Sequence, residues 1–211
     1  MNVSVTLPRS FYNRPTLDVA RDLIGKVLVH MRRGVRTSGI IVEVEAYIGE
    51  SDPACHAAPG PTRRNEPLYG DPGHAYVYLN YGIHCLVNVV TEAQGSPAAV
   101  LLRALSPLEG VDVMRRRRAR DVKGRRRLAR ATVGDHELCR GPGNLTMAMG
   151  ITLTENRVDL SGDRLFVEER DIHPGPPGVI VWGPRIGIRV GTERPWRAYV
   201  RDCAAVSNPQ T

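Results

Sequence analysis

The clearest structural pattern in the chain is Ile41-Val42-Glu43-Val44-Glu45-Ala46-Tyr47. Residues 40–45 alternate β-prone side chains, which predicts a strand with Ile40, Val42 and Val44 on one face and Ile41, Glu43 and Glu45 on the other. Two acids would then share one side of a sheet. An edge strand with a solvated face gives the same pattern, so other features must decide between these interpretations.

The composition indicates a basic protein with one folded unit. The 211 residues (23.3 kDa) suit a single domain, 1–211, with a substantial core. The net charge is +7 and the pI is about 9.6, and among the 29 basic residues only Lys26 and Lys123 are lysine. An arginine-rich surface suits phosphate-bearing partners. A preference for arginine codons would explain the arginine-to-lysine ratio but not the positive balance.

Cysteine usage and hydropathy favour a reduced, intracellular, soluble protein. The four cysteines are scattered without a CxxC pair, and the N-terminus does not resemble a signal peptide. No apolar run approaches the ~20 residues that a membrane span needs. We therefore expect no membrane association.

Strand candidates outnumber helix candidates and follow one another closely, which predicts an α+β fold. We expect a curved, mostly antiparallel β-sheet with surrounding helices and a protruding β-hairpin. Thr16 can cap a first helix that Gly25 ends. Strands are expected at 27–30, 38–45, 75–79, 84–90, 98–105, 164–168, 178–182, 186–190 and 198–201, with a turn at Arg33-Gly34, and helices at 17–24, 108–119, 125–131 and after Gly143. The loop from Gly49 to Gly73 is rich in Pro and Gly, and its length suggests a functional segment.

A second alternation marks the predicted hairpin Tyr76–Asn88. Tyr76, Tyr78 and Asn80 would share one strand face, and Val77, Leu79 and Tyr81 the other. Tyr81 precedes Gly82 at the expected turn, where an exposed aromatic ring can act as a wedge in a base stack. Packing of Tyr81 on its own loop remains the alternative.

Two arginine runs add to a possible nucleic-acid footprint. Met114–Arg120 and Arg125–Arg127 carry more positive charge than one helix face can neutralise, and Gly141-Pro142-Gly143 then opens a helix. Helix N-termini bind phosphates. Each feature is weak alone, because charge runs are most often solvated faces, but together they favour nucleic-acid binding.

Several ordered blocks carry a family resemblance that spans nearly the whole chain. They are Leu17–Lys26, Ile41–Tyr47, His56, Thr62–Asn65, Gly73–Gly82, Asn88, Val100–Gly110, Glu137–Leu145, Arg185–Gly187 and Pro195–Arg197. Together they resemble the alkyladenine (3-methyladenine) DNA glycosylases, the monofunctional kind found in bacteria and mammals. Residues 49–55 and the tail after Arg201 match little.

The resemblance implies a role for each matching residue. Hydrolysis of an N-glycosidic bond needs a carboxylate that activates water, and the family pattern gives this role to Glu45 rather than Glu43, with Arg103 holding the water. An ordinary salt bridge from Arg103 to either acid is the alternative. The base pocket would consist of Tyr47, His56, Tyr78 and Asn88, the last excluding the amine of guanine, while Tyr81 fills the gap in the duplex. We expect DNA-backbone contacts at Arg63, Arg64, Asn65, Arg140, Gly141 and Gly143.

Other function classes fit less well. A metal enzyme could use Cys55-His56 and His84-Cys85, but adjacent strand residues point to opposite faces and ligand spacings are absent. Glu43 and Glu45 lie about 7 Å apart on one strand, whereas the acid pair of a carbohydrate hydrolase flanks its bond from opposite sides. A non-catalytic basic nucleic-acid-binding protein would have no reason to place Glu45 among stacking rings, and substitution of Glu45 tests this alternative.

The sequence thus predicts a monofunctional DNA glycosylase without metal or other cofactor. Its expected partner is double-stranded DNA with a damaged purine of the 3-methyladenine, hypoxanthine, ethenoadenine or 7-methylguanine class. We expect a monomer in the cytoplasm of a bacterial cell, associated with the nucleoid.

Overall fold

The computed structural model describes residues 5–119, 133–169 and 179–207. Its strands are β1 (Val5–Thr6), β2 (Val27–Arg32), β3 (Val35–Ile48), β4 (Ala75–Asn80), β5 (His84–Val90), β6 (Ala98–Glu109), β7 (Leu165–Glu169), β8 (Ile180–Gly183) and β9 (Arg197–Val200). Its helices are α1 (Arg9–Tyr12), α2 (Thr16–Leu23), α3 (Val111–Arg118) and α4 (Pro142–Met149), with 3-10 turns η1 (Glu66–Tyr69), η2 (Asp135–Glu137) and η3 (Leu153–Glu155). The predicted helix at 125–131 lies outside the described residues.

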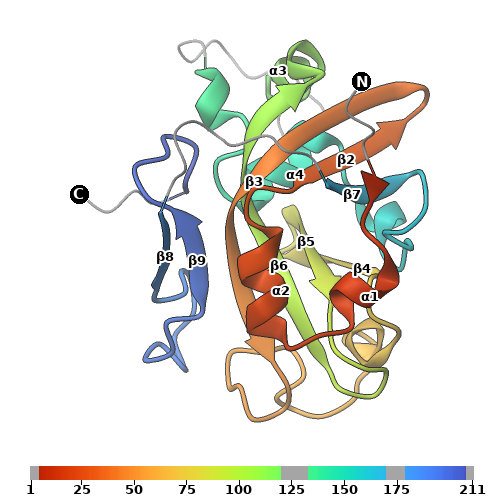
Figure 1. The fold of residues 1–211 in the computed structure, drawn as a ribbon, viewed down its shortest axis with the longest axis vertical. Coiled ribbons are helices and arrows are strands. Elements are labelled where there is room, and N and C mark those ends of the chain that lie inside the picture. The colour runs from red at the N-terminus through yellow and green to blue at the C-terminus, as the bar shows by residue number, and fades with distance from the viewer. Residues whose placement is uncertain (1–4, 120–132, 170–178, 208–211) are drawn as a thin grey trace.

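The strands form a curled antiparallel sheet around the long strand β3 (Figure 1). The order is β1-β7-β2-β3-β6-β5-β4, and every pairing is antiparallel. The short pair β8–β9 joins the sheet through β3, beside Glu43, Val44 and Glu45. The α+β prediction is therefore confirmed. None of the helices in the described segments has the length and apolar character of a membrane span.

Local turn chemistry sets the two main hairpins. Arg33 and Gly34 connect β2 to β3 with φ of 52° and 74°, the left-handed pair that a two-residue hairpin turn requires. Tyr81 and Gly82 take a similar conformation between β4 and β5, with φ of 49° and 68°. Both turns lie where the sequence predicts them.

Two of the predicted elements are wrong. The helix expected from residue 108 starts at Val111, because β6 continues to Glu109 and Gly110 turns the chain at φ +71°. A Cβ at Gly110 would lie 2.5 Å from the Arg36 carbonyl oxygen, so only glycine fits there. The strand expected at 186–190 is an irregular loop, in which Gly187 has φ +79° and the Ile186 amide donates to a side chain rather than to a strand.

The register between β3 and β6 shifts at three places, and two of these shifts flank Glu43. The pairs Ile41–Leu105, Glu43–Ala104 and Val44–Leu102 leave Val42 and Arg103 without direct partners in this ladder. The predicted grouping of Ile41 with the two glutamates is wrong, because the bulge at Val42 turns Ile41 into the same core as Val44. The bulge at Arg103 brings its guanidinium to the side of Glu43 and Glu45.

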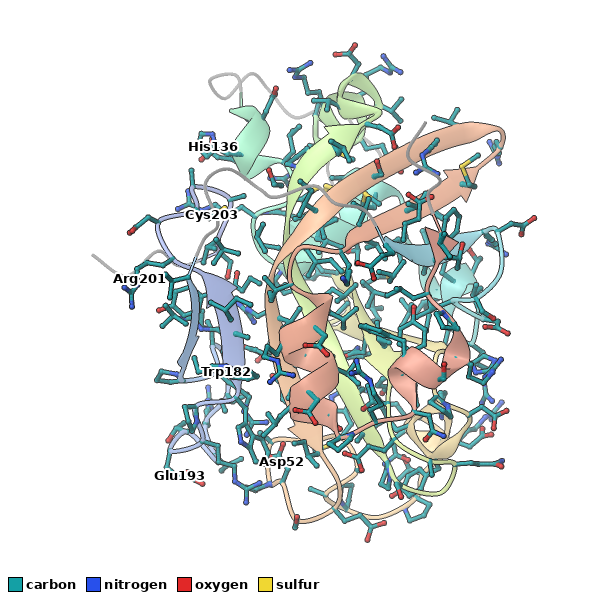
Figure 2. The ribbon with its side chains drawn as sticks, in the orientation of Figure 1. Asp52, His136, Trp182, Glu193, Arg201 and Cys203 are labelled. Carbon is teal, nitrogen blue, oxygen red and sulfur yellow. The ribbon has the colours of Figure 1, made fainter. Side chains whose placement is uncertain are left out.

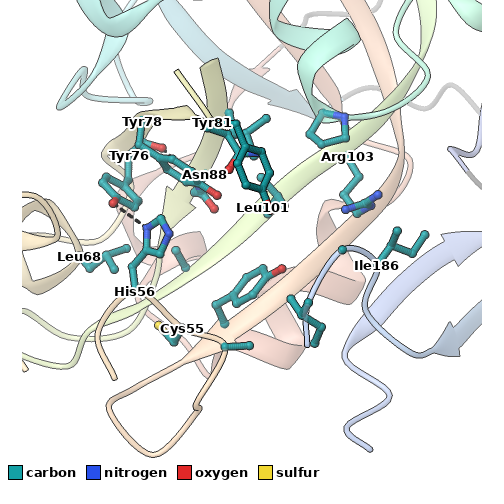
Figure 3. Close-up of a pocket in the computed structure, with 18 residues that line it drawn as sticks. Cys55, His56, Leu68, Tyr76, Tyr78, Tyr81, Asn88, Leu101, Arg103 and Ile186 are labelled. Atoms are coloured by element: carbon teal, nitrogen blue, oxygen red, sulfur yellow. Dashed lines mark hydrogen bonds between the residues drawn. The ribbon is translucent and has the colours of Figure 1, made fainter. Parts of the chain in front are cut away.

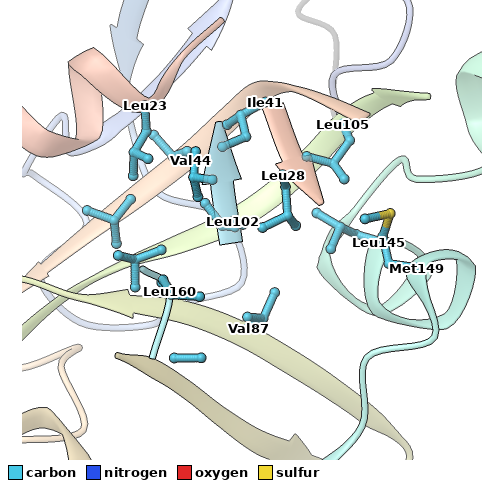
Figure 4. Packing of buried hydrophobic residues seen from close by; sticks show 14 of the residues in the cluster. Leu23, Leu28, Ile41, Val44, Val87, Leu102, Leu105, Leu145, Met149 and Leu160 are labelled. Atoms are coloured by element: carbon cyan, nitrogen blue, oxygen red, sulfur yellow. The ribbon is translucent and has the colours of Figure 1, made fainter. Parts of the chain in front are cut away.

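The main core fills the space between the concave sheet, α2 and α4 (Figure 4). Its large side chains without exposed surface include Leu23, Leu28, Ile41, Leu102, Leu105, Leu145 and Met149. Full burial of each such side chain contributes about 1.5–3 kcal/mol. The core therefore holds β3 and β6 rigidly, and the polar residues on their other face are fixed with them.

Candidate active site

A cavity of about 400 Å³ opens between the hairpin β4–β5, strand β6 and the loop after β8 (Figure 3). Its size falls within the roughly 300–1,000 Å³ of small-molecule sites. Six residues predicted for the site line it together: Tyr47, His56, Tyr78, Tyr81, Asn88 and Arg103. They come from four separate parts of the chain, so the curled sheet is what assembles them.

One wall of the cavity is aromatic. The rings of His56 and Tyr78 lie 4.4 Å apart and those of Tyr76 and Tyr78 lie 5.3 Å apart, measured between centroids. His56 Nδ1 is hydrogen-bonded to the Tyr76 hydroxyl at 2.9 Å, and the other ring nitrogen, Nε2, takes no part in this bond. Burial, with help from the Arg64 charge, lowers the pKa of His56, so the ring is neutral at pH 7. Sequence reasoning noticed Tyr76 but did not assign it to the pocket.

Asn88 is held in place by its neighbour across the β4–β5 ladder. Its side chain is buried, and Nδ2 donates to the Tyr76 carbonyl oxygen at 3.0 Å. This bond fixes the amide at the cavity wall, beside the aromatic rings.

Glu45 has no exposed surface and does not itself line the cavity, but it contacts three residues that do, Tyr47, Arg103 and Ile186, and so lies directly behind the cavity wall. Its Oε2 accepts from the Tyr47 hydroxyl at 2.8 Å, and its Oε1 accepts from the Ile186 amide at 2.7 Å and lies 3.2 Å from Arg103 Nη1. Burial raises the pKa of Glu45, and the Arg103 charge and these donors offset only part of the increase. The carboxylate is thus a stronger base than an exposed glutamate.

Glu43 anchors Arg103 from the other side. It accepts from Arg103 Nε at 3.0 Å, from Arg197 Nη1 at 3.0 Å, and from the Ser207 amide and hydroxyl at 2.7 and 2.9 Å. Arg103 Nη2 also donates to the Ser207 hydroxyl at 3.2 Å. The two interpretations of Arg103 are therefore compatible, because one guanidinium bridges both acids while it faces the cavity.

Tyr81 is the most exposed large hydrophobic residue of the hairpin tip, at 87%. Leu79 and Ile83 beside it are 41% and 52% exposed. The prediction that Tyr81 faces away from Tyr76 and Tyr78 is wrong, because the left-handed turn takes it out of the strand alternation and places it at the cavity rim.

The six residues expected to contact the DNA backbone lie in two segments, residues 63–65 and residues 140–143. Arg63 and Arg64 are exposed, and the Arg64 guanidinium lies 5.5 Å from the centre of the Tyr78 ring. Asn65 is buried, and its amide donates to the carbonyl oxygens of His56 and Gly60, so its side chain organises the loop.

The other three expected backbone contacts lie at the start of α4. Arg140 Nε donates to the Val206 carbonyl oxygen, and Gly141 has φ +91°. A Cβ at Gly143 would lie 2.9 Å from the His84 ring, so this glycine is needed for packing.

Besides Tyr76, four residues in or around the site were not assigned to it from the sequence: Asp52, Arg185, Ile186 and Ser207. Only Arg185 and Ile186 carried a signal, as part of the block Arg185–Gly187. Asp52 and Ser207 lie in segments without a recognisable pattern. No group of three or more His, Cys, Asp or Glu side chains among the described residues could hold a metal ion.

Comparison with known sequences identifies the family of the chain. Residues 10–204 match the family described as Methylpurine-DNA glycosylase (MPG). The chain belongs to this family. The glycosylase is thus a hydrolase of DNA repair, which confirms the enzyme class expected from its sequence.

Relatives cover nearly the whole glycosylase chain. Proteins named as candidate 3-methyladenine DNA glycosylases are 48% identical in Methanocella arvoryzae, 46% in Chlorobium phaeobacteroides and 43% in Burkholderia lata. These alignments cover 95%, 95% and 97% of this chain and 95%, 94% and 92% of the relatives.

Proposed function

We propose that this glycosylase is monofunctional and removes damaged purines from double-stranded DNA with a water molecule that Glu45 activates. One observation carries the proposal: a buried carboxylate, ion-paired to Arg103 at 3.2 Å, directly behind a cavity with aromatic walls. The names of the relatives support 3-methyladenine as one lesion. Hypoxanthine, ethenoadenine and 7-methylguanine are the further candidates.

The cavity suits a base that has left the duplex. Extrusion of a nucleotide costs a few kcal/mol, because pairing and stacking are lost. Stacking on Tyr78 and His56 on one side and Tyr47 on the other recovers about 1–3 kcal/mol for each contact. Damaged bases pair and stack less well, so the balance favours them.

The hydrolytic step follows from the arrangement around Glu45. Its Oε1 is occupied by the Ile186 amide and Arg103, whereas Oε2 has one donor, the Tyr47 hydroxyl. We assign proton acceptance to Oε2. The N-glycosidic bond breaks with its electrons moving to the base, and the carboxylate, still negative, stabilises the positive sugar in the transition state. The water oxygen bonds to the sugar C1′ as its proton passes to Oε2, and a cationic base such as 3-methyladenine leaves as a neutral molecule.

Asn88 supplies discrimination against normal guanine. Its side chain is fixed by Tyr76 and cannot turn away from a base edge that enters the cavity. A guanine would bring its exocyclic amine against this edge, whereas adenine derivatives carry hydrogen there. Crowding therefore disfavours guanine, and equally 7-methylguanine, which keeps this amine, relative to adenine derivatives, so we expect 7-methylguanine to be the slower of the candidate lesions to be bound.

The test is single-turnover excision by Glu45→Gln, with Glu43→Gln as the matched control two residues away on the same strand. Loss of a positioned base costs roughly 10²- to 10⁴-fold in rate. We expect Glu45→Gln to lose most excision while it binds lesion duplexes nearly as well as the unchanged protein. Glu43→Gln should lower the excision rate of the folded protein less than Glu45→Gln does.

Duplexes with a single 3-methyladenine, hypoxanthine, ethenoadenine or 7-methylguanine serve as substrates for all variants. If Glu43→Gln proved the more severe change, the assigned roles would be wrong. Equal excision by Glu45→Gln and the unchanged protein would contradict Glu45 as the base.

A further inference from the structure

Arg185 is a fully buried guanidinium that the hydrolytic step does not use. Its Nη1 and Nη2 donate to the two carboxylate oxygens of Asp52 at 2.6 and 2.8 Å, and neither side chain has exposed surface. Nη1 also donates to the Ala46 carbonyl oxygen at 3.0 Å and Nη2 to the Gly191 carbonyl oxygen at 3.2 Å. One side chain therefore joins the end of β3, the loop after it and the loop before β9.

The guanidinium also lies against the rings at the back of the cavity. Its central carbon is 4.7 Å from the centre of the Tyr47 ring and 5.2 Å from that of Trp196. Tyr47 lines the cavity, whereas Arg185 has no exposed surface, so Arg185 supports the ring from behind. Figure 2 shows Asp52 at the lower end of the sheet, near the loop that carries Glu193.

The residue after Arg185 makes the contact that matters for catalysis. The Ile186 amide donates to Glu45 Oε1 at 2.7 Å, and residues 186–188 line the cavity. This segment is irregular rather than part of the sheet, and Gly187 has φ +79°. Because no strand ladder holds the amide in place, another interaction must fix it, and the Arg185–Asp52 pair is the adjacent one.

We propose that Arg185, locked by Asp52, is a positioning residue that holds the Ile186 amide on Glu45 and the Tyr47 ring against the cavity. The proposal rests on the proposed role of Glu45 as the base. A planar, bidentate fork determines both the position and the orientation of the chain that follows it, which a lysine ammonium cannot do.

The pH dependence of the excision rate reports whether the Ile186 amide is held on Glu45, because this contact affects the pKa of Glu45. The groups that face Glu45 are Arg103 from β6, Glu43 and Tyr47 from β3, Tyr78 from β4, and Arg185 with the Ile186 amide from the loop. The Ile186 amide favours the ionised carboxylate and opposes the effect of burial on its pKa. Release of this amide therefore raises the pKa of Glu45 further.

The experiment compares Arg185→Lys and Asp52→Asn with the unchanged protein in single-turnover excision at saturating enzyme, over a range of pH. Misplacement of catalytic groups costs up to about 100-fold, so we expect a rate at pH 7 that is roughly 10- to 100-fold lower. The acid limb of the pH–rate profile, where the rate falls as Glu45 becomes protonated, should move to higher pH in both variants. Affinity for a duplex that contains a tetrahydrofuran abasic analogue should change by only a few fold.

Arg164→Gln is the control for lost stability, because Arg164 pairs with the buried Glu155 and neither residue lines the cavity. It should lower the melting temperature without any change in the acid limb. Asp52→Asn keeps the experiment informative if Arg185→Lys does not fold. An acid limb that stays in place in Asp52→Asn, or normal activity of Arg185→Lys, would overturn the proposal.

Hydrogen exchange at the Ile186 amide supplies a readout that needs no excision. We expect faster exchange in Arg185→Lys and Asp52→Asn than in the unchanged protein and in Arg164→Gln. Unchanged protection of Ile186 would overturn the positioning role. If instead Glu45→Gln excised as well as the unchanged protein, the proposed function would fail while the exchange result still tested the Arg185–Asp52 contact.

Discussion

Burial determines the chemistry of Glu45. The side chain has no exposed surface, and its position behind Tyr47 and Arg103 raises the pKa of the carboxyl despite three donors. The base form is the ionised one, so activity is lost as the pH falls through this raised pKa. We predict an acid limb in single-turnover excision at a pH above the ordinary glutamate pKa of about 4.3.

A duplex with 7-methylguanine suits this measurement, because the cationic base leaves without a proton and the limb reports the carboxylate alone. His56→Gln is the control, because the lowered pKa of His56 places the titration of this pocket residue in the acid range as well; the acid limb should persist in this variant. An acid limb that persists in Glu45→Gln would show that another group titrates.

The lysine content bears on what happens after the base is lost. Cleavage of the abasic strand through a Schiff base needs an amine nucleophile. Of the two lysines, Lys26 forms an ion pair with Glu169 and does not line the cavity, and Lys123 lies outside the described residues. We predict an intact abasic strand as product, so a covalent enzyme–DNA adduct trapped with borohydride would contradict the prediction.

At the scale of an element, the hairpin β4–β5 has two faces with different tasks. Val77 and Val87 belong to the main core, whereas Tyr76, Tyr78 and Asn88 line the cavity. The tip beyond them makes few contacts, since Tyr81 is 87% exposed. The hairpin is thus anchored at its base and exposed at its tip.

We predict that Tyr81→Ala impairs base flipping without any effect on hydrolysis or folding. A ring that fills the gap in the duplex stabilises only the flipped state, so its loss weakens binding and slows excision. The defect should be smaller opposite a mismatch or a gap, where less stacking must be broken. Excision and 2-aminopurine fluorescence on matched and mismatched duplexes measure this effect.

Thermal melting of the free protein supplies the control for Tyr81→Ala. A large drop in melting temperature, or an equal defect on both kinds of duplex, would make Tyr81 a packing residue and place the wedge elsewhere.

At the scale of the whole molecule, buried carboxylates link stability to pH. Burial would raise the pKa of Asp52, but the Arg185 guanidinium and the amides of Ala54 and Ile48 lower it below its ordinary value. Burial would likewise raise the pKa of Glu155, but its hydrogen-bond donors, among them Thr152 and Arg164, lower it below its ordinary value. Both groups therefore stabilise the fold above their unfolded pKa values, and this contribution is lost as the pH falls through the folded values.

We predict that the urea concentration at the midpoint of unfolding decreases as the pH is lowered from 6 to 3, because carboxyl groups in the unfolded chain titrate near about 4. Asp52→Asn and Glu155→Gln should each be less stable at pH 6 and should each flatten this dependence, because the variant side chain no longer titrates. The same slope in both variants and in the unchanged protein would assign acid unfolding to other groups.

Features that depend only on residues close together in the chain could be predicted from the sequence. The turns at Arg33-Gly34 and Tyr81-Gly82 need left-handed residues that the local sequence supplies, and helix α2 ends before Gly25. The tyrosine run likewise predicted one face of the hairpin. The family resemblance then named six residues that the fold brings into one cavity, although their roles remain predictions.

Tertiary structure alone decided the rest, because distant segments pair according to the energy of the whole sheet. The register between β3 and β6 places the bulges at Val42 and Arg103, and no local pattern encodes that register. The loop after β8 is not a strand because its amide binds Glu45, and the Arg185–Asp52 pair joins residues 133 positions apart. Sequence by itself determined the antiparallel α+β class and the family, whereas packing determined how the Glu45 carboxylate is held.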